Sequence, residues 1–212
     1  ALQLLSEVFY LQGELEQAEQ LNQQILTDAV GDESMLDDQG IAALNLANIA
    51  YERNDLDEAE QLATRALDLG RQRANEVLQV QAAIRLSYIH LVKGDLIEAR
   101  QLLQSMETRI QNVTLLREIQ NAKVRLCISS NDISALDGWV KMVSTEKQYD
   151  LHLQKEAEAF TLARLRIAEN KPKQALDILS SWRTNIAENG RVRSQVEEFI
   201  LEALAYHVDS KP

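Results

Sequence analysis

Residues 53–67 read "RNDLDEAEQLATRAL", and versions of this segment recur along the chain at residues 12–26, 93–107, 130–144 and 169–183. Aligned on one register, the copies place Ala18, Ala59, Ala99, Leu136 and Ala175 at the same position, with steps of 41, 40, 37 and 39 residues. A fixed period of this length is the sequence signature of a protein built from stacked structural repeats. The chain is therefore expected to form a repeat array.

Each copy follows a second apolar segment, such as "IAALNLANIAYE" at residues 41–52. Apolar residues recur at i, i+3, i+4 and i+7 in both segments, which predicts two amphipathic helices per repeat. The position between the two helices is occupied by Gly13, Asn54, Gly94, Asn131 and Asn170. Glycine and asparagine enter the left-handed backbone region at the lowest cost, so this position predicts the end of each first helix.

The pattern predicts an all-α fold: a right-handed superhelical solenoid of antiparallel helix pairs, with five repeats and a final helix. Only seven Gly and two Pro are present among 212 residues, which leaves little material for the turns of a β fold. We expect one domain with repeats at about 1–30, 36–72, 76–111, 114–146 and 150–188, and a terminal helix at 192–207. The fourth repeat should be irregular, because Leu136 replaces the alanine and Gly138 falls inside the second helix.

The second repeat resembles a tetratricopeptide repeat (TPR). Residues 45–70, "NLANIAYERNDLDEAEQLATRALDLG", contain the small Ala47, the aromatic Tyr51, the turn at Asn54, and Ala59 and Ala66 in the second helix. The family period is about 34 residues, so longer helices or loops must account for the longer step here.

Residues 156–207 resemble a narrower group, the MalT-like, LuxR-type ATP-dependent transcription regulators. The matching elements are Leu162-Ala163-Arg164-Leu165, Gln174-Ala175-Leu176, Gly190-Arg191 and Ala203-Leu204-Ala205. The resemblance implies a regulatory domain that binds a ligand or protein, oligomerises, and lies between an ATPase module and a helix-turn-helix module. The chain starts at Ala1 inside a helical pattern, which suggests a fragment of such a regulator. It has no G-x-x-x-x-G-K-[ST] loop, so no cofactor is expected in this segment and ATP is expected only in the neighbouring module.

In a solenoid of helix pairs, the first helices line the concave side, which is the usual binding surface. Helical phase places seven candidate residues there: Tyr10, Asn48, Tyr51, Glu52, Tyr88, Arg125 and Arg164. Aromatic rings and guanidinium groups suit a small-molecule inducer or a regulatory protein or peptide. The alternative is structural: Tyr51 and Tyr88 pack the core, and the arginines pair with glutamates of a neighbouring helix.

Charge argues against direct contact of this segment with nucleic acid, because the net charge is −11. Residues 1–60 carry 14 acidic residues and one basic residue, Arg53. This acidity is either a solvated face or a docking surface for a basic partner or neighbouring domain. No apolar run is long enough to span a membrane. The single cysteine, Cys127, is expected to be buried in a reducing compartment, which predicts a cytoplasmic protein.

The sequence predicts neither catalysis nor a metal site. His90, His152 and His207 each lack a second ligand three or four residues away. The repeated carboxylates stand at the starts of second helices, where the helix dipole explains them. A free-standing TPR scaffold that binds peptides or proteins is the main alternative function, and a homo-oligomer fits either function. The flanking sequence distinguishes the two functions.

Overall fold

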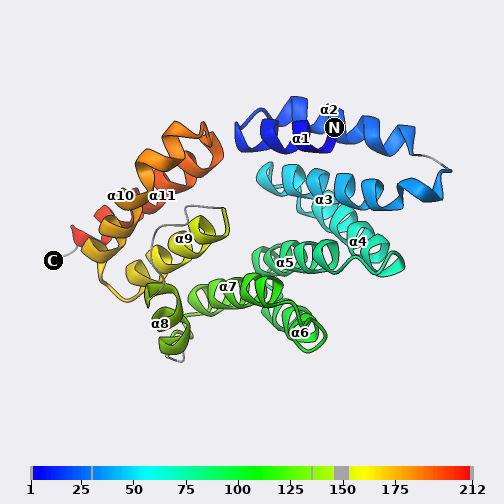
Figure 1. The fold of residues 1–212 in the computed structure, drawn as a ribbon. Helices are drawn as coiled ribbons and strands as arrows, with labels where there is room; N and C mark the ends of the chain where they lie inside the picture. The colour runs from blue at the N-terminus through cyan, green and yellow to red at the C-terminus, as the bar shows by residue number, and fades with distance from the viewer. Residues whose placement is uncertain (1, 30, 135, 146–152, 211–212) are drawn as a thin grey trace. The chain divides into compact units, whose positions relative to one another are not determined.

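The computed structural model describes residues 2–29, 31–134, 136–145 and 153–210, and within these ranges the chain is helical and contains no strand (Figure 1). The elements are α1 (Leu2–Leu11), α2 (Leu15–Asp28), the 3₁₀ helix η1 (Glu33–Met35), α3 (Leu36–Glu52), α4 (Leu56–Gln72), α5 (Glu76–Lys93), α6 (Leu96–Glu107), α7 (Val113–Ser129), α8 (Asp137–Thr145), α9 (Leu153–Ala168), α10 (Pro172–Glu188) and α11 (Val192–Asp209). The predicted all-α fold of TPR-like helix pairs is confirmed, while the right-handed superhelix stays a prediction.

The chain forms two compact units, residues 1–119 and residues 120–212, called here the N-terminal and C-terminal units. The division falls inside α7. Nine basic and 20 acidic residues lie in the N-terminal unit, against 13 of each in the C-terminal unit, so the whole net negative charge belongs to the N-terminal unit. The predicted single domain and repeat ranges stay predictions, and the boundary expected between residues 146 and 150 lies outside the described residues.

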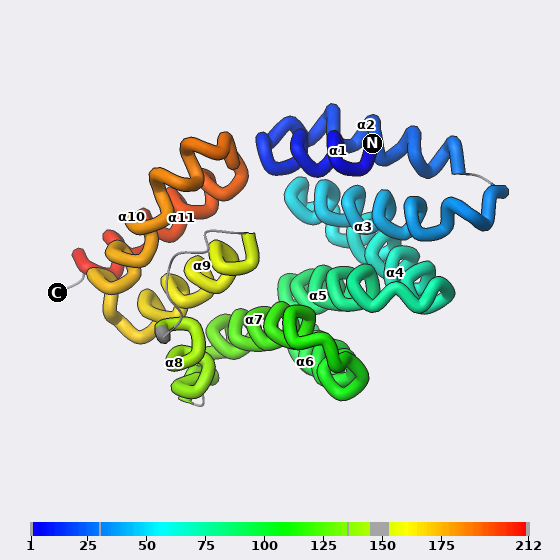
Figure 2. Tube along the Cα trace, viewed as in Figure 1, coloured from blue at the N-terminus to red at the C-terminus, as the bar shows by residue number. Residues whose placement is uncertain are grey.

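The chain reverses direction between the two helices of a pair, as Figure 2 shows for α3 and α4. All five predicted junction residues have positive φ: Gly13 (79°), Asn54 (62°), Gly94 (88°), Asn131 (57°) and Asn170 (59°). The left-handed residue lets the next backbone N–H turn back, and the N–H of Asp55 bonds the carbonyl of Ala50 at 2.9 Å. The Asp55 side chain then accepts from the N–H of Glu58 and caps α4.

The recurring alanine is the fourth residue of its helix in four of the five repeats. Ala18, Ala59, Ala99 and Ala175 are each at most 1% exposed. In the fourth repeat, α8 begins at Asp137, so Leu136 precedes the helix and Gly138 is its second residue. The predicted irregularity of this repeat is confirmed.

Each unit has its own apolar core. In the N-terminal unit, small residues of α3 and α4, such as Ala47 and Ala63, pack with Leu78 and Ile89 of α5. In the C-terminal unit, Trp182 packs among residues of α9, α10 and α11.

A second cluster of the C-terminal unit surrounds Trp139. Both tryptophans are therefore core residues. The single cysteine lies at the edge of the cluster around Trp139 and is only half-buried, so the expectation of a buried Cys127 was wrong in degree. It stands one residue beyond the fully covered Leu126 and contributes to packing without being enclosed.

A substitution at the recurring alanine tests whether the two helices of a pair approach closely at this position. Ala59→Leu is expected to lower the free energy of unfolding by about 1–3 kcal/mol, because extra methylenes in a packed core force shifts of side chains and backbone. Urea unfolding followed by circular dichroism measures the change. The control is Gln61→Leu, which adds an apolar side chain at an exposed position of the same helix. Equal stability of Ala59→Leu and wild type would contradict the packing role.

The turn between α4 and α5 differs from the others, because its left-handed residue is Ala74, with φ of 54°. A methyl group in this region costs roughly 1–2 kcal/mol. Ala74→Gly is therefore expected to raise the free energy of unfolding by about 1 kcal/mol. At the exposed Ala203 inside α11, the same change should lower it by about 0.5–1 kcal/mol. Unfolding measurements on both variants are the test, and the two changes in the free energy of unfolding should have opposite signs.

Candidate functional site

In the N-terminal unit, two predicted residues of α3 are joined by an arginine of α5. The Nε of Arg85 donates to the side-chain oxygen of Asn48 at 2.5 Å. Its guanidinium carbon lies 4.6 Å from the centre of the Tyr51 ring, a cation–π contact. Asn48 and Tyr51 are one helical turn apart and share a face of α3, so one side chain of α5 contacts both.

A second contact joins α1 to α3. The hydroxyl of Tyr10 donates to the carboxylate of Glu52 at 3.2 Å. Tyr88 is half-buried on α5, one turn after Arg85. The predicted residues of this unit therefore lie on the first helices of three repeats, and a polar contact links each helix to the next.

In the C-terminal unit, the two predicted arginines belong to one cluster of charges around Glu197 of α11. Arg164 of α9 donates to the carboxylate of Glu197 at 2.8 Å, and the Glu197 side chain is 24% exposed. Burial raises the pKa of Glu197, but the positive charges of three arginines outweigh burial and hold it below its ordinary value. These arginines, in decreasing order of effect, are Arg164, Arg125 and Arg193. Both predicted arginines of this unit, Arg125 and Arg164, therefore act on the same carboxylate of α11.

Two further carboxylates of this unit are buried against arginines. Glu156 of α9, 4% exposed, accepts from the hydroxyl of Ser194 at 2.6 Å and from Arg191 at 2.7 Å. Glu198 of α11, 1% exposed, accepts from Arg183 of α10 at 2.7 Å. Removing one partner of such a pair leaves an uncompensated buried charge, so these pairs fix how α9, α10 and α11 pack together.

The structure agrees in part with the structural alternative. Tyr51 packs against the apolar core of its unit, and Arg164 pairs with a glutamate of another helix. The binding role of the seven residues stays a prediction. Sequence reasoning missed Arg85, Arg193 and Glu197. Arg85 had a usable signal, because it stands three residues before Tyr88 on the same helical face.

No group of His, Cys, Asp and Glu suited to hold a metal ion occurs in the described part of the chain, which does not include His152. Over the same residues, no helix combines the length and apolar character needed to cross a membrane.

Repeated antiparallel helix pairs, with a left-handed junction residue and a buried alanine in the second helix, are consistent with a TPR-type repeat protein, although the step of about 40 residues is longer than the usual step of about 34. Within this class, the sequence model of the MalT-like TPR region matches residues 1–212, so the chain belongs to that family. None of the curated proteins compared with the chain matches it.

Glu197 makes the stability of the protein depend on pH in a defined direction. Its folded pKa lies below the ordinary value of 4.5, so its contribution is complete above that pH and is lost as the pH falls through the folded pKa. The free energy of unfolding of Glu197→Gln should therefore be lower than that of wild type at about pH 7, and the difference should shrink toward about pH 3.

Substitution of Glu118 in α7 is a control that should change the free energy of unfolding in the opposite direction. Burial raises the pKa of Glu118, so Glu118→Gln should stabilise the protein at about pH 7 and lose this effect in acid. Unfolding measured over the same pH range compares the two variants. A Glu197→Gln difference that grows toward acid would contradict the arginine cluster.

Proposed function

We propose that this domain is the regulatory sensing module of a MalT-like, LuxR-type ATP-dependent transcription regulator. The family match over residues 1–212 carries the proposal. In it, a small-molecule inducer or a regulatory protein or peptide binds the face formed by the first helices. Nucleotide binding and DNA recognition belong to neighbouring ATPase and helix-turn-helix modules.

The polar contacts that the first helices make with other helices support a mechanism for the response. Tyr10 joins α1 to α3 through Glu52, Arg85 joins α5 to α3, and Arg164 joins α9 to α11 through Glu197. A ligand that bonds to these side chains competes with contacts that hold neighbouring repeats in their packing. Binding then favours a different stacking of the repeats, because a ligand shifts an equilibrium by its difference in affinity for the two states.

The proposal includes several further features. The domain is a non-catalytic module of a cytoplasmic regulator, forms a homo-oligomer and interacts with neighbouring domains of its own chain. It makes no direct contact with nucleic acid or membrane, and ATP acts only in the neighbouring module. The charge of −11 supports the absence of direct DNA contact, because nucleic-acid binding depends on neutralising phosphates.

The experiment combines genetics with transcript sequencing. The complete protein that contains this domain is expressed from its own gene as wild type, as Arg85→Met with Arg164→Met, and as Arg65→Met. Arg65 is the matched control, because it is exposed and donates to an amide oxygen, that of Gln39, at 3.3 Å. We expect the double variant to lose regulation by roughly 5-fold or more and Arg65→Met to behave like wild type.

Immunoblotting verifies that the variants accumulate equally. Regulation by the double variant equal to wild type under every growth condition would exclude this face as the sensing surface. The complete gene sequence is the second readout. A phosphate-binding loop on one side and a helix-turn-helix on the other are expected, and a gene without either supports the free-standing scaffold.

A further inference from the structure

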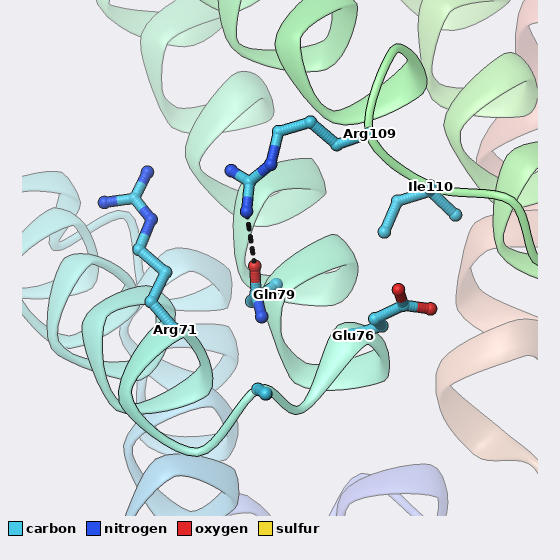
Figure 3. A pocket seen from close by; sticks show the side chains of 6 residues that line it. Arg71, Glu76, Gln79, Arg109 and Ile110 are labelled. Carbon is cyan, nitrogen blue, oxygen red and sulfur yellow. Dashed lines mark hydrogen bonds between the residues drawn. The ribbon is translucent and has the colours of Figure 1, made fainter.

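A pocket of about 250 Å³ lies at the end of the N-terminal unit where α4 turns into α5 (Figure 3). Its walls come from Arg71 at the end of α4, Ala74 in the turn, Glu76 and Gln79 at the start of α5, and Arg109 and Ile110 after α6. The pocket is therefore shared by two consecutive repeats. Its lining residues are distinct from Asn48, Tyr51 and Arg85, so it is a separate site from the face of the first helices.

The side-chain amide of Gln79 lines the pocket and is held in place by a hydrogen bond. Gln79 is only 5% exposed, and its side-chain nitrogen donates to the carbonyl of Gly70 at 3.0 Å. A Cβ on Gly70 would lie 3.1 Å from the Cγ of Gln79, so the glycine permits this close approach of α4 and α5. The amide oxygen of Gln79 is thereby held toward Arg109, which donates to it at 3.4 Å.

Two opposite charges on the pocket wall lack a charged partner among the residues that the structure describes. In a unit with 20 acidic residues, the guanidinium of Arg109 has an amide oxygen as its hydrogen-bond partner and no carboxylate within ion-pair distance among the described residues. Over the same residues, the carboxylate of Glu76 makes neither a hydrogen bond nor an ion pair. Arg109 lies above Gln79 in Figure 3, while Glu76 lies to one side of it, as does the apolar Ile110. The second guanidinium, of Arg71, pairs with Asp68 at 3.2 Å on the helix surface.

We propose that this pocket binds a small apolar amino acid as its zwitterion. The carboxylate of the ligand accepts from Arg109 and Arg71, its ammonium donates to Glu76, and its carbon chain lies against Ile110 and the methyl group of Ala74. A ligand with both charges gives each of these two groups a charged partner at once. The volume is below the range of about 300–1,000 Å³ typical of drug-sized ligands, which agrees with a small metabolite.

The test is calorimetric titration of the complete chain with four compounds. L-leucine and 6-aminohexanoate carry both charges at different separations, 4-methylpentanoate carries only the carboxylate, and 3-methylbutylamine carries only the ammonium. We expect L-leucine or 6-aminohexanoate to bind with a dissociation constant on the order of 10 µM to 1 mM, and the single-charge compounds to bind at least tenfold more weakly. Absence of binding by both zwitterions overturns the proposal, and so does equal binding of 4-methylpentanoate.

Variants test whether the charges of Arg109 and Glu76 each contribute to ligand binding. Arg109→Met and Glu76→Gln should each weaken binding of the zwitterion at least tenfold. The matched controls are Arg65→Met, another guanidinium that contacts an amide, and Glu98→Gln, another exposed glutamate in the first turn of a helix. Both controls should bind like wild type. Circular dichroism establishes that each variant is folded, and wild-type affinity in folded Arg109→Met or Glu76→Gln would also overturn the proposal.

Discussion

The close approach of two helices at one small residue is the constraint on which the structure depends. The fourth residue of the second helix is alanine in four repeats, and it is completely or almost completely buried in each. Alanine allows this approach without loss of helix propensity. Where the alanine is absent, in the fourth repeat, the second helix starts later and is only nine residues long. A small residue at this position therefore accompanies the close packing of the four regular pairs.

Sequence reasoning predicts the parts of this fold that depend on local chemistry. The five junction residues could be identified from their residue type, because positive φ favours glycine and asparagine. The left-handed Ala74 could not, because alanine carries no signal for that conformation. Contacts between repeats also could not be predicted from the sequence. The position of Arg85 between Asn48 and Tyr51 depends on how α5 lies against α3, and the cluster around Glu197 depends on residues of three helices.

In the proposed function, the first helices of this protein have two roles. Their polar side chains hold neighbouring repeats together, and the same side chains form the face proposed for ligand recognition. A contact with an amide or a tyrosine ring is easier to exchange for a ligand than a buried ion pair, because breaking the ion pair strands a charge. By this criterion the contacts of Arg85 are more readily remodelled than the pair of Arg191 with Glu156.

The uneven distribution of charge gives the two units different responses to dissolved salt. The N-terminal unit has 11 more acidic than basic residues, whereas the C-terminal unit is balanced. Like charges spread over one unit repel one another, and ions screen this repulsion over a distance of about 8 Å at physiological ionic strength. Lower ionic strength is therefore expected to reduce the stability of the N-terminal unit more than that of the C-terminal unit, so the salt concentration acts mainly on one half of the chain.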